Sequence, residues 1–350
     1  MTRKDDGPIE RKVQVAGGST FTLSLPREWG VRHGLSKGET VYLYPEQDRC
    51  VVAPSTVDTD ATTTRITAAD SEWAGLVQQI KGAYTDGSEK VIVEGDGVLD
   101  DELVKRVTNT VEGFIGMEVQ SVSDAEIVIM DHLDPDTVST PQSIGLMHHL
   151  AVEMHHDAVA AVRTNEETLA RIVHERDDHV DRLFAFVSRC LNRVLIDIGE
   201  LGRLDVSRRH AFHYYKIARE LERVADKAER ITDVALDQST IPSEELGEQF
   251  EELVRTATEV VTLALNDETD SALKTHRAVV DLLDSLDRQL ATREDPDAYR
   301  YGRDLVESAR RTSSYGLNIV NMTLEVSVGE SQVPSRWNLE RPSRSTGQFG

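Results

Sequence analysis

Two pairs of acidic residues in the C-terminal half of the chain are the side chains best placed to do chemistry. They are Asp177 with Asp181, in DDHVD, and Glu222 with Asp226, in ERVAD. Each pair is spaced i, i+4 within a long helical pattern, so both carboxylates project from one helix face, about 5–6 Å apart. If two such helices pack face to face, four carboxylates meet. Such all-oxygen groups suit a hard cation (Mg²⁺ or Mn²⁺) or iron, as an ion or a cluster, although Zn²⁺ stays among the candidates.

The spacing along the chain predicts that the two pairs lie level with each other. A short turn between antiparallel helices is expected at residues 199–204. The first pair is centred on His179 and the second on Val224, and both centres are equally far from the middle of that turn. An error of about two residues in the turn would shift the pairs by roughly 3–6 Å along the helix axis. Four carboxylates could still share one cation or cluster.

A second interpretation of these acids is a solvated helix face, which is common in a strongly acidic chain. Neighbouring basic side chains could then balance them, namely Arg223, Lys227 and Arg230. Like charges at i, i+4 destabilise a helix by about 0.2–0.5 kcal/mol per pair. Two such pairs at matching heights are therefore unexpected by chance, and both interpretations stay open.

Another set of potential ligands lies in MHHLAVEMHHDAV. His149, Glu153 and His156 share a helix face, and Glu153 with His156 has the Glu-x-x-His spacing of di-iron helical bundles. The later helices carry no second Glu-x-x-His, so an exposed polar stripe is the competing interpretation. The sequence has no phosphate-binding loop or serine-nucleophile motif, and Cys190 lies on an apolar helix face typical of a core. An enzyme is therefore not expected.

The composition is strongly acidic. The formal net charge is -23, from 62 acidic and 39 basic residues, of which only 9 are Lys, and aromatic residues make up 5%. Acid excess with scarce Lys is typical of a halophile's proteins, although an ordinary acidic protein is the alternative. A phosphate backbone would be repelled by such a surface, so any contact with DNA must be confined to a local patch.

The two cysteines and the absence of long apolar runs limit the compartment. Cys50 and Cys190 lie in different segments, so neither a disulfide framework nor a zinc motif is present. The N-terminus lacks an apolar signal sequence, and no run of about 18 apolar residues could span a membrane. We expect a soluble cytoplasmic protein.

The pattern of elements predicts a multidomain α+β chain. Residues 1–55 form a small β unit with strands near 11–15, 19–25, 41–45 and 49–54, and residues 55–64 read as a linker. An α/β spacer is expected over 65–136, with helices near 67–84 and 98–113 and strands at KVIVEG, EVQSV and EIVIM. From Ser139-Thr140-Pro141 onward the pattern is helical.

The helical part is predicted to contain two three-helix repeats. The expected helices span 141–163, 165–199, 205–237, 243–266, 269–292 and 297–326. Six helices of this spacing indicate an internal duplication, which divides the part into repeats over 140–240 and 241–328. Residues 329–350 are poor in apolar side chains and are expected to be disordered.

The N-terminal segment LPREWGVRHGLSKGETVYLYPEQDRCVVAP resembles the AbrB/SpoVT/MazE family. The LP-[KR]-E…GL-x-x-G-[DE] order carries the resemblance, which covers about residues 10–54. It implies a swapped-hairpin homodimer that binds DNA at promoters, with contacts from Arg11, Lys12, Arg27 and Arg32. Ser19 and Gly30 stand where family members usually have Arg, and residues 1–53 carry 8 basic and 7 acidic residues. A dimerisation module that has lost DNA binding is therefore the alternative.

The helical half resembles PhoU, a family of phosphate-signalling regulators built of two three-helix repeats. Asp177–Asp181 and Glu222–Asp226 match the family's [ED]-x-x-x-D motif, and ELERVADKAERI is close to its usual third-helix wording. The resemblance implies that these four residues are metal ligands. In the second repeat, SARRTSSYGLNI places Arg310 and Ser314 where acids are expected, so one metal site is implied, in the first repeat.

Together the two resemblances imply a regulator of phosphate uptake. The helical part would contact the ATPase of a phosphate ABC transporter or a phosphate sensor protein, while the N-terminal part would act at promoters. Two alternatives stay open: a carboxylate-bridged metal enzyme of the helical-bundle type, and an adaptor that does not bind DNA.

Overall fold

The computed structural model describes residues 8–18, 20–45, 49–54, 63–68, 72–133, 138–196, 200, 207–238, 240–292 and 296–327. Most of the predicted linker at 55–64, most of the predicted turn at 199–204 and the whole predicted tail at 329–350 lie outside these residues. The chain separates into two compact units, Met1–Asp60 and Ala61–Gly350.

The first unit consists of two short hairpins and a helical turn. Antiparallel strands β1 (Gln14–Ala16) and β2 (Thr20–Thr22) are joined through glycines with positive φ, Gly17 at 65° and Gly18 at 82°. Helix α1 (Arg27–Arg32) follows, and then the antiparallel strands β3 (Tyr42–Pro45) and β4 (Cys50–Ala53). All four predicted strands are present, but the first two are shorter than expected.

The apolar side chains of this first unit are largely exposed. Phe21 is 77% exposed, Val31 68% and Val15 64%, and α1 has no buried residue. A two-stranded hairpin alone is marginally stable, because it cannot bury enough apolar surface. The described residues of this unit therefore do not form a hydrophobic core within one chain.

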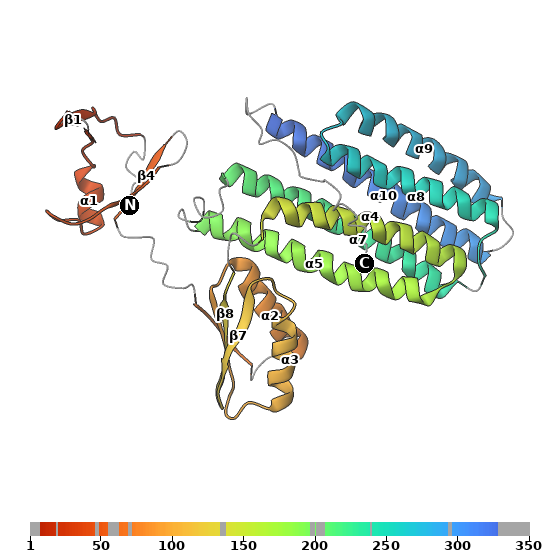
Figure 1. Cartoon of the computed structure of the whole chain (residues 1–350), viewed down its shortest axis with the longest axis horizontal. Coiled ribbons are helices and arrows are strands. Elements are labelled where there is room, and N and C mark those ends of the chain that lie inside the picture. The colour runs from red at the N-terminus through yellow and green to blue at the C-terminus, as the bar shows by residue number, and fades with distance from the viewer. Residues whose placement is uncertain are drawn as a thin grey trace, which may run out of the picture. The chain divides into compact units, whose positions relative to one another are not determined.

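The second unit begins with a four-stranded sheet and two helices. Its strands are β5 (Thr63–Thr67), β6 (Lys90–Glu94), β7 (Met117–Val122) and β8 (Glu126–Asp131), in the order β5-β6-β8-β7. Strand β5 is parallel to β6, and the other pairs are antiparallel. Helices α2 (Trp73–Asp86) and α3 (Asp101–Val111) lie on one side of this sheet (Figure 1). Their core includes Ile80, Tyr84, Val107 and Ile129.

The start of this α/β part corrects the sequence prediction. A linker was expected to run to residue 64 and a helix to begin near 67, whereas β5 occupies 63–67 and α2 begins at Trp73. The segment TTRIT is rich in β-branched Thr and Ile, which favour strands. Ile66 is buried in the core, whereas only residues 63 and 64 of this strand fell within the predicted linker. The polar composition was therefore misleading.

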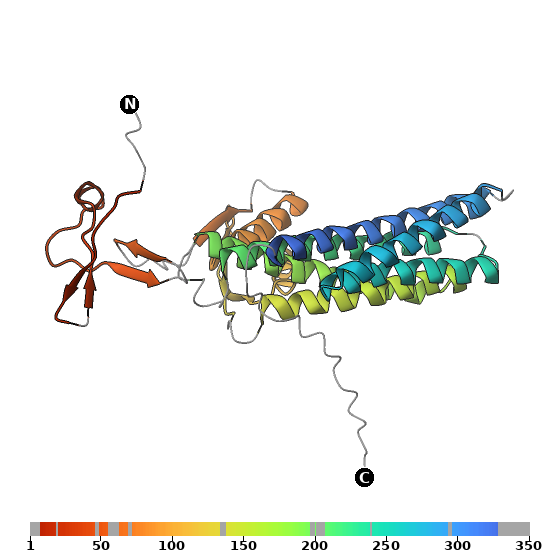
Figure 2. The same ribbon diagram turned by 90° about the horizontal axis from the view of Figure 1, so that it is seen from above.

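Six long helices follow within the described residues, close to the predicted ones. They are α4 (Thr140–Thr164), α5 (Glu167–Ile196), α7 (Arg208–Asp237), α8 (Glu244–Leu265), α9 (Thr269–Ala291) and α10 (Pro296–Ser327). Figures 1 and 2 show them side by side along a common direction. No helix in the described ranges is both long enough and apolar enough to cross a membrane.

Local signals define the ends of these helices. The Ser139 hydroxyl accepts a hydrogen bond from the Gln142 N–H at the start of α4, and Ser207 caps α7 in the same way through His210. Asn165 ends α4 in the left-handed conformation, with φ of 58°. Such caps satisfy backbone groups that the helix leaves unpaired, which is why the sequence placed these boundaries well.

The long helices pack as two sets of three. Helices α4, α5 and α7 pack on one another, as do α8, α9 and α10, and the sets meet through α4 with α8 and α7 with α10. At that seam His155 is fully buried and hydrogen-bonded to Thr312 on α10, at 3.0 Å. One hydrophobic core runs through both sets. Their origin by duplication stays a prediction.

Candidate cation site on the helical bundle

Four acidic residues gather between α5 and α7. We call Asp177, Asp181, Glu222 and Asp226 the acidic cluster; all four are partly buried. The negative charge of Asp181 acts on both Glu222 and Asp226 across the helix pair, and the charge of Asp226 acts on Asp177. The two predicted pairs are thus brought together. The turn used to predict this lies mostly outside the described residues, but the pairing that it implied is observed.

Burial and mutual repulsion raise the pKa values in this cluster. Burial, followed by the charges of Glu229, Asp181 and Asp226, raises the pKa of Asp177 to about 7. Burial is also the main cause that raises the pKa of Glu222 and the pKa of Asp226, with the charge of Asp181 adding to both. At neutral pH the ionised cluster is therefore electrostatically unfavourable unless a positive charge enters it.

Two further residues extend the cluster by one level. His174 Nδ1 lies 2.8 Å from Glu229 Oε1, which joins α5 to α7 beyond Asp177 and Asp226. The numbers of the facing residues give the same total of 403 at each level: 174 with 229, 177 with 226 and 181 with 222. Applying the predicted hairpin symmetry one turn further along would have found both residues.

A basic side chain from the α/β part also reaches the cluster. Lys81 on α2 places its Nζ atom 3.7 Å from Asp181 Oδ2. Of the basic residues suggested as balancing partners, Arg223 pairs with Glu220 at 3.0 Å and Arg230 with Asp233 and Asp304. The charges of Arg223 and Lys227 still lower the pKa values of nearby members, so the solvated-face interpretation holds in part.

The four carboxylates are the kind of donors that a hard cation prefers, but they are not arranged as a coordination shell. Within the described ranges, no three His, Cys, Asp or Glu side chains are placed so that they could hold a metal ion. The carboxylates are nevertheless close enough to raise one another's pKa, and a partly buried group of acids has the chemistry that Mg²⁺ or Mn²⁺ prefers. Side-chain rotation would be needed to close such a shell.

The helices that carry the acidic cluster match a known protein domain. Residues 144–235 match the PhoU domain. The match covers most of α4 and α7 and all of α5, and so includes the whole acidic cluster. It supports the resemblance to the PhoU family, and a PhoU domain suggests a regulator of phosphate homeostasis. No significantly similar protein was found among curated proteins.

The other candidate ligands on the PhoU domain remain apart from this cluster. His149, Glu153 and His156 are exposed on α4, as expected for a polar stripe. The buried histidines of that helix are His148 and His155, which the sequence did not single out. His148 Nε2 lies 2.9 Å from Thr262 Oγ1 on α8, and His155 bonds to Thr312 on α10. The two histidines therefore connect the first helical set to the second.

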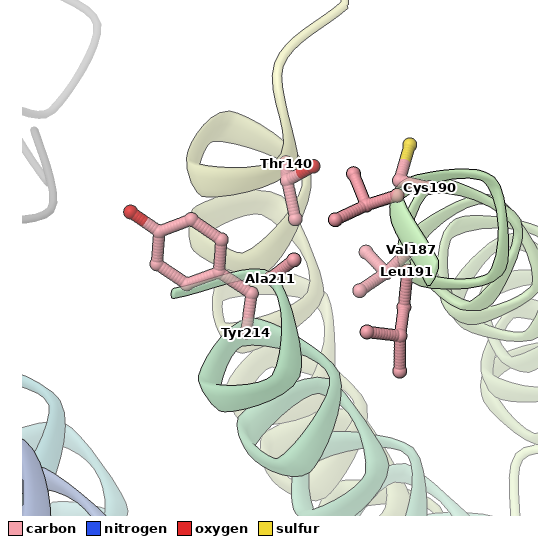
Figure 3. A pocket seen from close by; sticks show the side chains of 7 residues that line it. Thr140, Val187, Cys190, Leu191, Ala211 and Tyr214 are labelled. Atoms are coloured by element: carbon pink, nitrogen blue, oxygen red, sulfur yellow. The ribbon is translucent and has the colours of Figure 1, made fainter. Parts of the chain in front are cut away.

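The cysteine of the PhoU domain lies beside a small cavity near the ends of α4, α5 and α7. Cys190 is 6% exposed, and burial raises the pKa of its thiol to about 11. The cavity has a free volume of about 10 Å³, which is at the limit for one water molecule. Its lining also includes Thr140, Val187, Leu191, Ala211 and Tyr214 (Figure 3). A buried, protonated thiol is a core residue and a poor nucleophile.

The residues predicted to contact DNA are exposed on the first unit. Arg11 and Lys12 precede β1, and the Arg11 guanidinium donates to the backbone oxygen of Glu10 at 2.9 Å. Arg27 and Arg32 lie at the two ends of α1. Because they are five residues apart, they project from different sides of the helix. The structure of this unit leaves them accessible, and their role stays a prediction.

Among the described residues of the second helical set, acids between α9 and α10 pair with an arginine. Arg310 on α10 pairs with Asp287 on α9 at 3.1 Å and with Glu307 at 3.3 Å. His276 Nδ1 lies 2.7 Å from Ser313 Oγ at the same pair of helices. The arginine that stands where the family motif has an acid therefore pairs with acids of both α9 and α10.

Proposed function

We propose that this protein is a PhoU-like regulator of phosphate uptake and not an enzyme. The match of residues 144–235 to the PhoU domain is the observation that carries the proposal. According to this proposal, the helical bundle contacts a phosphate transporter ATPase or a phosphate sensor protein. The test is expression profiling of a deletion strain in high and low phosphate. Loss of the normal difference in phosphate-uptake genes is expected, and an unchanged response would contradict the proposal.

The regulator would hold a divalent cation or iron in the acidic cluster. The four carboxylates would be its ligands, with Glu229 close enough to assist. The cation would supply positive charge between α5 and α7 and so hold the two helices together. The raised pKa of Asp177 supports this role, because its ionised form lacks a sufficient counter-charge. Metal analysis of untagged protein, with and without chelation, tests the site.

The N-terminal unit would supply dimerisation and DNA binding. Its exposed apolar side chains, such as Phe21 and Leu43, support an interlocked dimer, because a second copy would cover them. Removal of residues 1–60 should abolish the dimer in light scattering. Replacement of Arg11, Lys12 and Arg27 by Ala should abolish promoter binding in mobility-shift assays in concentrated KCl. If the wild-type chain dimerises but binds no DNA, the chain is an adaptor.

A further inference from the structure

Two neighbouring stretches of the bundle differ in charge from the rest of this acidic chain. Residues 182–196 of α5 and residues 207–219 at the start of α7 contain no Asp or Glu, but they contain seven Arg or Lys. The rings of Phe184 and Tyr215 stack with their centroids 5.8 Å apart, so the two stretches lie side by side. In a chain of net charge -23, they create a local excess of positive charge.

Two basic side chains of the α5 stretch are neutralised inside the molecule. Arg189 donates a hydrogen bond to Asp131 Oδ2 of the α/β part at 2.6 Å. Arg193 donates to the same oxygen at 2.6 Å and to Glu200 Oε1 at 3.0 Å. Both arginines therefore serve the attachment of the α/β part to α5, and they add little positive charge to the surface.

The basic side chains of α7 lie on one outward face. At 3.6 residues per turn, the members of this face fall within about 80° of one another around the helix. Phe212 is 54% exposed, and Lys216 Nζ lies 5.8 Å from the centre of its ring. The face thus places an exposed aromatic ring among basic groups. We call it the α7 basic face, and it consists of Arg209, Phe212, Lys216 and Arg219.

One carboxylate is shown in contact with this face among the described residues. Lys216 Nζ pairs with Glu325 Oε2 at 2.7 Å, near the end of α10. Arg209 donates to the backbone oxygen of Glu325 at 2.9 Å and so stabilises the end of that helix. Arg219 is exposed and has no ion pair within the described ranges, although its charge acts on Glu222 at the border of the acidic cluster. The basic groups therefore outnumber the acids that they meet.

Two further observations show an excess of positive charge at this end of α7. Burial, followed by the charges of Lys216 and His210, lowers the pKa of His213 to about 4, although the charge of Glu325 acts in the opposite direction. In addition, α7 begins at Arg208 and has no acid in its first turn, where the helix dipole favours negative charge. A bound anionic group would relieve both effects.

We propose that the α7 basic face is a docking surface for an acidic segment of a partner protein that also carries apolar side chains. Its basic groups complement carboxylates, and arginine and aromatic side chains are enriched among the residues that carry binding energy at protein interfaces. Leu195 and Ile196 at the end of α5 are 58% and 61% exposed, and they offer further apolar area.

The size of the α7 basic face favours a protein segment over DNA or a membrane. An extended polyanion would also meet the acidic cluster, which begins one helical turn beyond Arg219, and would be repelled there. A short acidic segment can stay within the face. This inference deepens the proposed function and rests on it, because it locates the contact of the bundle with a protein partner.

The test measures binding of a fluorescein-labelled peptide that repeats Glu-Glu-Glu-Leu to the full-length protein, by fluorescence anisotropy at a fixed KCl concentration. The face variant is Phe212→Ser with Arg219→Ser, and the matched control is Leu273→Ser with Arg277→Ser, two exposed positions on α9. We expect the face variant to bind at least about fivefold more weakly than wild type, and the control to match wild type. Equal Tm values verify that both variants are folded.

A second measurement needs no variant. A peptide that repeats Gln-Gln-Gln-Leu keeps the apolar side chains and removes the charge, so wild type should bind it at least about fivefold more weakly than the acidic peptide. Absence of binding to the acidic peptide, equal binding of the two peptides, or equal losses in both variants would each overturn the proposal. Tighter binding of phosphatidylglycerol vesicles or duplex DNA through the same residues would overturn it too.

The outcomes separate this inference from the proposed function. Peptide binding through the α7 basic face, combined with an unchanged phosphate response in the deletion strain, would keep the docking surface and contradict a role in phosphate uptake. An altered phosphate response without peptide binding would overturn the docking surface alone.

Discussion

The α5–α7 face and the α9–α10 face of the bundle differ in how their acids are balanced. Between α5 and α7 the acids raise one another's pKa, and the only ion pair shown for any member of the acidic cluster among the described residues is the one with Lys81, at 3.7 Å. Between α9 and α10, Arg310 pairs with Asp287 at 3.1 Å. The α9–α10 face thus has a close arginine partner for its acids, while the acids of the α5–α7 face raise one another's pKa and have only the more distant Lys81 as a paired cation among the described residues.

The two faces also differ in what covers them. Helix α5 packs against α2 of the α/β part and buries Arg189 there. Helix α9 buries only one narrow stripe of its described residues, including Val279, Leu283 and Leu286. The comparison teaches that the helix carrying the first acid pair is also the one attached to the α/β part.

The largest expected effect comes from breaking the attachment of α5. Arg189→Ala leaves Asp131, which is 7% exposed, with one partner fewer and removes the bond to Tyr84. We expect the free energy of unfolding to fall by about 3 kcal/mol, as for other disrupted buried pairs. Arg288→Ala, on the exposed side of α9, should change it by less than about 0.5 kcal/mol. Denaturant titration at constant KCl measures both, and equal losses would show that the two faces are not distinct.

The next effect is a gain of a site on the second face. Arg310→Glu with Ser314→Asp restores the acidic motif on α10 opposite the acids of α9. We expect the Mn²⁺ stoichiometry to rise from one to about two per chain, because a carboxylate that can bind the metal replaces the Arg310 guanidinium. Isothermal titration calorimetry counts the sites. A stoichiometry that stays at one would mean that acid content alone does not make a site in this bundle.

Much of this comparison was predictable from local patterns. The helix predicted over 269–292 is observed over Thr269–Ala291. The spacing of the two acid pairs from the predicted turn placed them next to each other, and the charges of the two pairs act on one another across α5 and α7. Hydrophobic period, caps and residue spacing are local properties that the sequence displays directly. The loss of the acidic motif at Arg310 was visible in the same way.

The remaining features depend on contacts between distant segments. Neither the ion pair of Lys81 with Asp181 nor that of Arg189 with Asp131 follows from periodicity, because each joins residues far apart in the sequence. Strand β5 was missed for a related reason: TTRIT forms a strand by pairing with β6, which lies more than twenty residues further along the chain, while its first two residues were assigned to the linker. His155 was overlooked because its partner, Thr312, lies on the last helix.

A smaller effect concerns the pH dependence of the metal-free protein. The pKa of Asp177 is raised from 3.8 to about 7, so its ionisation destabilises the folded state as pH rises through that window. Asp177→Asn should therefore raise Tm by about 2–4 °C above pH 7 and have no effect below pH 3.8. The control Asp284→Asn, at an exposed position on α9, should leave Tm unchanged both above pH 7 and below pH 3.8. Thermal scans in the presence of chelator decide this, and a gain that is independent of pH would contradict the assigned cause.

The most direct test of the central claim is Mn²⁺ binding by paired variants of the two faces. Asp181→Asn with Asp226→Asn removes one carboxylate from each helix of the acidic cluster, and Asp281→Asn with Asp284→Asn removes two exposed carboxylates from α9. The wild-type chain and the α9 variant should each bind one Mn²⁺, and the acidic-cluster variant should bind at least about tenfold more weakly. Unchanged binding by the acidic-cluster variant would contradict the claim that α5 and α7 form the cation site.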